Sequence, residues 1–408
     1  MNTSPRQYHT PSILILLASA LGMLAFFTFG LGLALQGAVG LFTGAADEST
    51  LAFMMSGGLM FTGLLALPGG WYSLRRLMGQ PPTDQPTLTF GALDWLILLT
   101  VWPLLILLGD AVLKTPVAWA IMPVISIIAA TIPIVFILRL ALNRLNIGPR
   151  QRVWGVLGLG LTISPLIILI IEGVILIMGV IVIVIFLVMQ PEHLSGMTAL
   201  ADKLENASEE QVLTIIGPLI FQPGGLLILF GFVAVAVPLV EEMFKTLPLW
   251  FFGKKLNNPI EGFLLGAVSG AAFALFENIG YAANDTEMWA TTTLMRIGAG
   301  SMHILTGGLM GWGLALSFTQ RKYLRLSGIY LLVTFIHALW NALGVSMGLG
   351  VLSSLIDSAP VFWRGAPLTA LGALITLGAG GLVVLVTANR RMQSEQVTLL
   401  ENPASPVE

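Results

Sequence analysis

Residues 153–189 read VWGVLGLGLTISPLIILIIEGVILIMGVIVIVIFLVM, and Glu172 is the single ionisable side chain among them. A bilayer core of roughly 30 Å needs about 20 apolar residues in a helix. This stretch is longer than one perpendicular crossing requires, so it has length to tilt or protrude, or to kink at Pro165 or Gly173. It predicts a chain embedded in a membrane.

The composition of the whole chain indicates the same environment. Of 408 residues, 56% are hydrophobic and 10% are charged, with a mean hydropathy of +0.89. A soluble domain carries about 25% charged residues. The chain has no cysteine, which excludes disulfide scaffolds, cysteine-ligated zinc and thiol catalysis. A net charge of -2 does not indicate nucleic acid as a partner. The first apolar run, 13–35, has spanning length, so no cleavable signal peptide is expected.

Working outward from 153–189, ten segments are long and apolar enough to cross a bilayer, which predicts an all-α, polytopic transmembrane helix bundle. They lie near 12–36, 51–73, 94–113, 117–139, 153–189, 224–252, 260–283, 289–318, 327–349 and 366–389. The long stretch 190–223 is predicted to hold an amphipathic helix on the outer membrane surface, with a lid or substrate-docking element as the alternative. The polar tail from about Gln393 is predicted to be disordered.

The cationic residues predict the orientation. With the N-terminus inside, the inner loops and tails hold 14 of the 19 Lys and Arg residues, the outer loops hold 3, and 2 lie within spans. The inner set is Arg6, Arg75, Arg76, Arg139, Arg144, Arg150, Arg152, Lys254, Lys255, Arg321, Lys322, Arg325, Arg390 and Arg391. The outer set is Lys114, Lys203 and Arg364. Because cationic residues favour cytoplasmic loops, both termini are predicted to be cytoplasmic.

Polar residues are unevenly distributed among the spans. A charge in the hydrocarbon costs at least a few kcal/mol, so each charged residue within a span is expected to have a structural or functional role. Spans one to five hold little charge, with Asp110 near an outer end, Arg139 at an inner end and Glu172 in mid-span. Spans six to nine hold Glu241, Glu242, Lys245, Glu277, Arg296, His303 and His337, together with Asn278 and Asn341. Four helices are therefore expected to converge on one polar cavity.

Two adjacent carboxylates mark the sixth span, VPLVEEMFKTLP at 237–248. On a helix, Lys245 falls at i+4 from Glu241 and i+3 from Glu242, between the two. Two carboxylates in low dielectric do not both ionise easily, whereas a lysine favours the charged form. The pattern suits one glutamate as a proton acceptor and the other as the partner of the lysine. The alternative is a salt bridge that only holds helices together.

The seventh span reads FALFENIGY, which places Phe273, Glu277 and Tyr281 on one face, with Asn278 beside them. The Glu–Asn pair is either a polar interhelical contact or part of a site. Preceding it is a ridge of small residues that permits close helix packing. This ridge consists of Gly262, Gly266, Gly270 and Ala274.

The eighth and ninth spans each carry a histidine near the middle. His337, Trp340 and Asn341 share one helix face, while Thr306 lies one turn after His303. A lone mid-span histidine is more often a hydrogen bond between helices than a catalyst. Two histidines together with a double glutamate favour a functional site.

In order, these motifs are E-E-x-x-K, F-x-x-x-E-N-x-x-Y, a mid-helix histidine and H-x-x-W-N, each on a separate predicted span. The set resembles the PrsW intramembrane proteases, which are similar in turn to the CAAX-processing glutamate proteases and to a non-catalytic subunit of γ-secretase. CAAX proteases carry E-E-x-x-x-R and F-x-x-x-H, so Lys245 and Glu277 fit the PrsW branch. The resemblance covers roughly 224–349, which predicts four regions: a five-helix region of unknown role, an outer segment, a catalytic core, and a last span with its tail. These are 1–189, 190–223, 224–349 and 350–408.

The resemblance implies hydrolysis of peptide bonds in membrane-anchored protein substrates, in the plasma membrane. The family role is the first cut of an anti-sigma factor near the extracytoplasmic side. By resemblance, Glu241 is the base, with Glu242 the second choice, and His303 orients water or protonates the leaving amine. His337 and Asn341 would donate to the oxyanion. The residues that support the site would be Lys245, Glu277, Asn278, Tyr281 and Trp340.

Two questions stay open at this point. Glu241, Glu277, His303 and His337 offer a ligand set for zinc. The chain has no H-E-x-x-H motif, however, and metal-independent glutamate catalysis is equally consistent with related families, so the expectation is that no metal is tightly bound. The runner-up functions are a proton- or ion-coupled transporter and a non-catalytic membrane scaffold. Transporters built from repeated halves place matching features in both halves, which this chain does not.

Overall fold

The structure is a computed structural model that describes residues 10–189, 191–205, 207–253, 256, 258–356 and 359–401. Across these residues the chain is helical and forms no strand, which confirms the all-α prediction. Arg6, Lys254 and Lys255 of the predicted inner set lie outside the described residues, as does the tail after Glu401.

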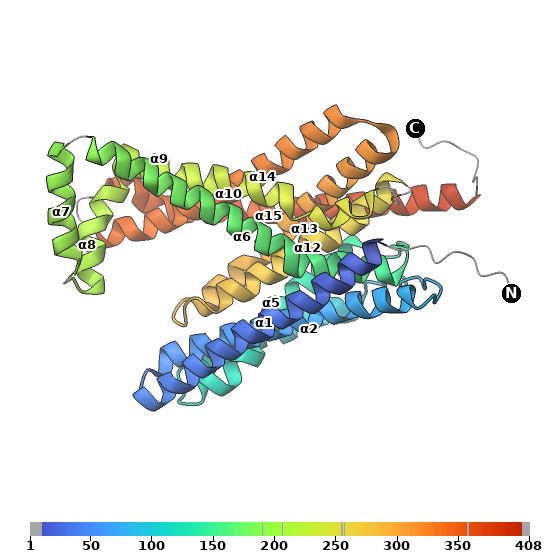
Figure 1. The fold of residues 1–408 in the computed structure, drawn as a ribbon, viewed down its shortest axis with the longest axis horizontal. Helices are drawn as coiled ribbons and strands as arrows, with labels where there is room; N and C mark the ends of the chain where they lie inside the picture. Colours follow the sequence, from blue (N-terminus) through green and yellow to red (C-terminus); the bar gives the residue numbers. More distant parts are fainter. Residues whose placement is uncertain are drawn as a thin grey trace. The chain divides into compact units, whose positions relative to one another are not determined.

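The helices follow the predicted spans to within several residues, except that α15 extends well past 389 (Figure 1). In chain order they are α1 (Thr10–Thr43), α2 (Ala46–Leu77), α3 (Ala92–Leu96), α4 (Trp102–Leu113), α5 (Ala118–Ala141), α6 (Arg150–Val188), α7 (Pro191–Glu205), α8 (Glu209–Ile220), α9 (Pro223–Phe230), α10 (Val237–Phe244), α11 (Leu247–Trp250), α12 (Pro259–Ala282), α13 (Trp289–Gln320), α14 (Tyr323–Leu355) and α15 (Ala366–Glu401). Two π-helical turns, η1 (Ile97–Val101) and η2 (Gly231–Ala236), and a 3₁₀ turn, η4 (Val361–Gly365), connect some of them.

Within the described residues, nine helical segments are long and apolar enough to cross a membrane, so the protein is a multi-pass integral membrane protein. The predicted eighth span forms one helix, α13, but is not among the nine. Its buried faces carry glycines, threonines and His303, which lower its hydropathy. The expected single amphipathic helix in 190–223 is instead a pair, α7 and α8. At the start of α8, Ser208 and Gln211 cap each other reciprocally.

The chain divides into two compact units, each described here by itself. Unit 1 comprises Met1–Leu166, Met243–Val333 and Gly378–Glu408, and unit 2 comprises Ile167–Glu242 and Thr334–Leu377. In unit 1, α12 lies at the centre of an apolar core and packs against α13 and α5, while α1 and α2 lie side by side. Unit 2 has a smaller apolar cluster around Phe221, Leu349 and Ile356.

The contact between α12 and α13 depends on glycines. A Cβ added at Gly262, Gly266 or Gly270 would overlap the backbone of α13. On α13, a Cβ at Gly307 or Gly311 would overlap the backbone of α12 in the same way. The predicted ridge of small residues is thus confirmed as a packing surface, because only glycine lets the two backbones approach so closely.

Each π-helical turn lies directly before a proline. In η2, the N–H of Val237 bonds the carbonyl of Phe232, five residues back, and Pro238 follows. In η1, Trp102 bonds Ile97 in the same way and Pro103 follows. Proline has no N–H and its ring clashes with the preceding turn, so the helix widens there instead of breaking. The predicted sixth span is consequently α9, η2, α10 and α11 in succession.

The helix α15 continues well past the apolar span to Glu401, so the expected disorder from about Gln393 does not hold for the described part of the tail. Asn389 donates through Nδ2 to the carbonyls of Ala141 (3.0 Å) and Asn143 (2.9 Å). Gln393 donates to the Asn143 carbonyl as well, at 2.9 Å. These polar contacts hold the end of α15 against the loop after α5.

Candidate functional site in the second half of the chain

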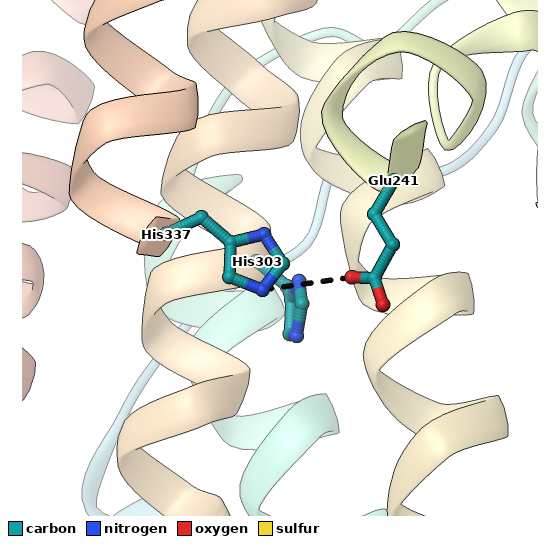
Figure 2. Close-up of side chains that lie close together, drawn as sticks. All are labelled: Glu241, His303 and His337. Carbon is teal, nitrogen blue, oxygen red and sulfur yellow. Dashed lines mark ion pairs between the residues drawn. The ribbon is translucent and has the colours of Figure 1, made fainter. Parts of the chain in front are cut away.

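In unit 2, His337 lies between the carboxylates of Glu241 and Glu242. Its Nδ1 is 2.8 Å from Oε1 of Glu242, and its Nε2 is 3.5 Å from Oε2 of Glu241, the pair joined by a dashed line in Figure 2. Glu242 is completely buried, while Glu241 and His337 are 6% and 2% exposed. An ionised Glu242 would accept this hydrogen bond from the Nδ1–H of His337, because a carboxylate without a proton only accepts hydrogen bonds. The imidazole is thereby oriented with Nε2 toward Glu241.

Asn341, one turn after His337 on α14, binds the backbone of η2, the turn before α10. The carbonyl of Val233 has no ordinary helical donor, because Val237 donates to Phe232 and Pro238 has no N–H. Asn341 supplies the missing donor, its Nδ2 lying 2.9 Å from that carbonyl. The amide expected at an oxyanion is therefore engaged with the backbone of η2.

In unit 1, His303 of α13 is held by a second glutamate. Its Nε2 lies 2.7 Å from Oε2 of Glu277 on α12. The ring of Phe273, one turn before Glu277, meets the imidazole edge to face at 5.3 Å between centroids. His303 itself is 1% exposed. The predicted face of α12 that carries Phe273 and Glu277 thus contacts His303 directly.

Arg296 completes this group, and the motif analysis did not include it. Its Nη2 donates to Glu277 at 2.8 Å, its Nε donates to Oδ1 of Asn278 at 2.7 Å, and its guanidinium lies 4.4 Å from the ring centroid of Tyr281. Arg296 precedes His303 by seven residues, so both lie on one face of α13. This spacing was the signal in the sequence that could have placed Arg296 on the same face as His303.

Lys245 lies one residue beyond the end of α10, so the helical spacing that placed it between the two glutamates does not continue to it. Its Nζ donates to Oγ1 of Thr306 at 2.5 Å, and its carbonyl accepts from Ser269 at 2.5 Å. The side chain is completely buried. Lys245 is therefore anchored to α13 one turn after His303.

The remaining predicted supporting residues are less enclosed. Tyr281 is 46% exposed and takes part through the stacking of Arg296 on its ring. Trp340, on the same face of α14 as His337, is half-buried.

The donor atoms suit a transition metal such as zinc. Glu241, His303 and His337 are all buried, and each offers one carboxylate oxygen or imidazole nitrogen to an ion. Zinc in proteins prefers nitrogen and oxygen ligands of this kind where cysteine is missing. Glu277, the fourth predicted candidate, contacts Arg296 and His303 instead.

Comparison with known proteins agrees with this chemistry. The family model described as PrsW family intramembrane metalloprotease matches residues 148–363, beyond the 224–349 expected from the motifs. No curated protein and no solved structure matches the chain. A protease of this family embedded in the bilayer acts on membrane-embedded protein substrates. Because the family model spans more than half of it, the chain belongs to the PrsW family of intramembrane metalloproteases.

Proposed function

We propose that this protein hydrolyses peptide bonds of membrane-anchored proteins at a divalent metal, with zinc as the best candidate, held by Glu241, His303 and His337. The observation that carries the proposal is shared by the two histidines: each is bound through one ring nitrogen to a buried or half-buried glutamate. Metal-ligating histidines almost always have such an outer partner, which fixes the tautomer and the ring orientation.

His337 fits the role of a ligand in detail. Glu242 binds its Nδ1, so Nε2 is the nitrogen that would face a metal. The distance from Nε2 to Oε2 of Glu241 is 3.5 Å, which is long for a hydrogen bond. Tetrahedral zinc with bonds of about 2.0–2.1 Å places neighbouring ligand atoms roughly 3.3–3.4 Å apart. The separation of the two atoms therefore suits joint ligation.

His303 is proposed as the third ligand through its Nδ1, since Nε2 is bound to Glu277. The short segment of chain between Glu241 and Lys245 supports the assignment of His303 as a metal ligand. Lys245 follows Glu241 by four residues and is anchored to Thr306, one turn from His303. Four residues span at most about 14 Å. In this proposal Glu242 and Glu277 orient the two histidines and do not bind the metal.

A bound metal of this type lowers the pKa of water and polarises a carbonyl oxygen. Glu241 has two carboxylate oxygens, so one would face the metal while the other accepts a proton from the attacking water. The carboxylate then returns that proton to the leaving amine. The oxygen of that water would bond to the acyl carbon, and the carbon–nitrogen bond would break as the amine takes up the proton. Glu241 thus remains the proposed base, with Glu242 as second choice.

The proposed substrate class is a protein with a single membrane span. The proposed orientation has both termini cytoplasmic, and cleavage would occur near the extracytoplasmic side. The specific reaction proposed is site-1 cleavage of an anti-sigma factor, the role that the family resemblance implies.

The test uses purified protein reconstituted with a single-span substrate, and it compares wild type with Glu241→Gln. We expect cleavage to fall by at least roughly 10²–10⁴-fold with little change in melting temperature, because a neutral amide is cheaper to bury than a carboxylate. The matched control is Glu287→Gln, an exposed glutamate in the loop after α12.

Metal dependence is measured on the same sample by metal analysis, followed by chelation and the return of zinc. Chelation should abolish cleavage and zinc should restore it, and His337→Ala should lower the bound metal. A stable Glu241→Gln protein that cleaves at the wild-type rate would remove Glu241 from the mechanism. Full cleavage by metal-free protein would leave the peptidase proposal standing without its metal.

A further inference from the structure

A small pocket with both apolar and polar walls lies among α5, α12 and α13 of unit 1. Its walls are apolar on the α5 side, where Ala129, Ala130 and Pro133 line it. On the other side it is lined by Thr293, Asn278 and Arg296. Polar side chains that face a pocket inside a membrane-embedded helix bundle need hydrogen-bond partners, because unsatisfied polar groups in low dielectric are costly.

The side chain of Thr293 indicates what occupies the pocket. Its side chain is 5% exposed, and among the described residues its Oγ1 has no hydrogen-bond partner. A buried hydroxyl without a hydrogen-bond partner is destabilising. The pocket has room for about one water molecule, which needs polar partners to stay. Thr293, Asn278 and Arg296 are such partners.

The charge of the pocket favours water over an anion. Among the residues that the structure describes, Arg296 is the only cationic side chain that lines it. Its guanidinium is already neutralised by Glu277, at 2.8 Å. An anion would therefore enter without a net positive charge to hold it, whereas water binds to neutral donors and acceptors equally well.

The pocket is connected to His303 by hydrogen bonds. Arg296 lines the pocket and donates to Glu277, and the same oxygen of Glu277 is 2.7 Å from His303. Asn278 lines the pocket too and accepts from Arg296. Polar contacts thus run without a break from the pocket to one of the proposed metal ligands.

We propose that this pocket holds a water molecule on Thr293 and is a water reserve for the hydrolytic site. The inference rests on the proposed function, because hydrolysis consumes one water for each peptide bond. The hydroxyl of that water joins the acyl carbon and its second hydrogen goes to the leaving amine. In a site surrounded by lipid, the supply of this reactant requires a hydrated route.

The first experiment removes the hydroxyl without changing the shape of the side chain. In Thr293→Val, we expect kcat to fall roughly tenfold, the equivalent of about one hydrogen bond, while KM and melting temperature stay near wild type. Thr293→Ser should retain most of the activity. The matched control is Thr291→Val, an exposed threonine on the same helix that does not line the pocket.

The second experiment does not depend on activity and uses the natural lack of cysteine. Ala282 lines the pocket and is 3% exposed, whereas Ala274 on the same helix is completely buried and does not line it. Ag⁺, a thiol-seeking ion close to water in size, should block Ala282→Cys against later alkylation in denaturant. It should leave Ala274→Cys open to alkylation.

The outcomes separate the two proposals. If Ag⁺ does not reach Ala282→Cys, the pocket is dry and the inference is wrong, whatever the enzyme cleaves. If Ag⁺ reaches it but Thr293→Val cleaves at the wild-type kcat, the pocket is hydrated but is no reserve. Failure of the proposed function would appear elsewhere, as unchanged cleavage by Glu241→Gln.

Discussion

The two buried histidines are held in the same way by very different helix pairs. His303 and Glu277 come from α13 and α12, whose backbones touch at Gly262, Gly266 and Gly270. His337 and Glu242 come from α14 and α10, and α10 follows a π-helical turn whose free carbonyl is bound by a side chain. Both arrangements leave one imidazole nitrogen fixed by a carboxylate.

The difference shows two ways of fixing a polar group in a membrane. Where helices touch along their length, glycine removes the side chains between them, and the backbone itself sets the geometry. Where a proline opens the helix, a side-chain amide must satisfy the exposed carbonyl. The first arrangement cannot adapt, because any added atom overlaps the neighbouring backbone. The second depends on a single hydrogen bond and is easier to perturb.

The largest expected effect is on the glycine contact. Gly266→Leu should prevent accumulation of folded protein, because the new side chain would overlap the carbonyl of Gly307 and the helix backbone cannot turn away. Expression and thermal unfolding in detergent measure this. The control is Gly280→Ala on the same helix, where a Cβ meets nothing within 4 Å. Normal folding of Gly266→Leu would show that α12 and α13 are not in close contact.

A smaller effect is expected from the charge balance around His303. Glu277→Gln leaves Arg296 without its carboxylate, and breaking a buried pair costs on the order of 3–5 kcal/mol. The double variant Glu277→Gln with Arg296→Gln should regain much of that stability yet remain poorly active, because outer partners of ligands contribute roughly 10–100-fold. Unfolding in denaturant and cleavage are measured for both. Equal stability of the single variant and wild type would contradict the ion pair.

The smallest expected effect is at the π-helical turn. Asn341→Leu keeps the size of the side chain but removes the donor to Val233, and an unsatisfied buried carbonyl costs about 1–3 kcal/mol. Pro238→Ala restores a backbone N–H, so the double variant should be more stable than Asn341→Leu alone. If Pro238→Ala gives no rescue, the assignment of Asn341 to the free carbonyl is wrong.

Much of the fold was predictable because the signal is one of length and polarity. Every predicted span is covered by helix, including α13, which is the least apolar of them, and α15 alone extends well past its predicted end. The interruption of the sixth span was not predicted. Pro238 predicts that the regular α-helix is interrupted. Whether the chain kinks, breaks or forms a π-helical turn depends on which donor binds the backbone carbonyl of Val233.

For the proposed site, the sequence indicates a set of candidate residues but not their geometry. Motif reasoning singled out Glu241, Glu242, His303 and His337, and the structure gives partners to both histidines. It did not assign Glu242 to His337 or Arg296 to Glu277. Partners on other helices follow from packing, which spacing along one helix does not contain.

The sequence by itself determined that this protein is a helical membrane protein of the PrsW type, because apolar length and unavoidable buried charges are properties of the chain. Only the tertiary structure decided which nitrogen of each histidine is bound, why Asn341 faces a backbone carbonyl and how Lys245 reaches Thr306. It also decided that α15 stays helical beyond the span, since Asn389 and Gln393 bind the carbonyl of Asn143 from a distant part of the chain. Such contacts join residues far apart in the sequence, and their energy is gained only when the helices have packed.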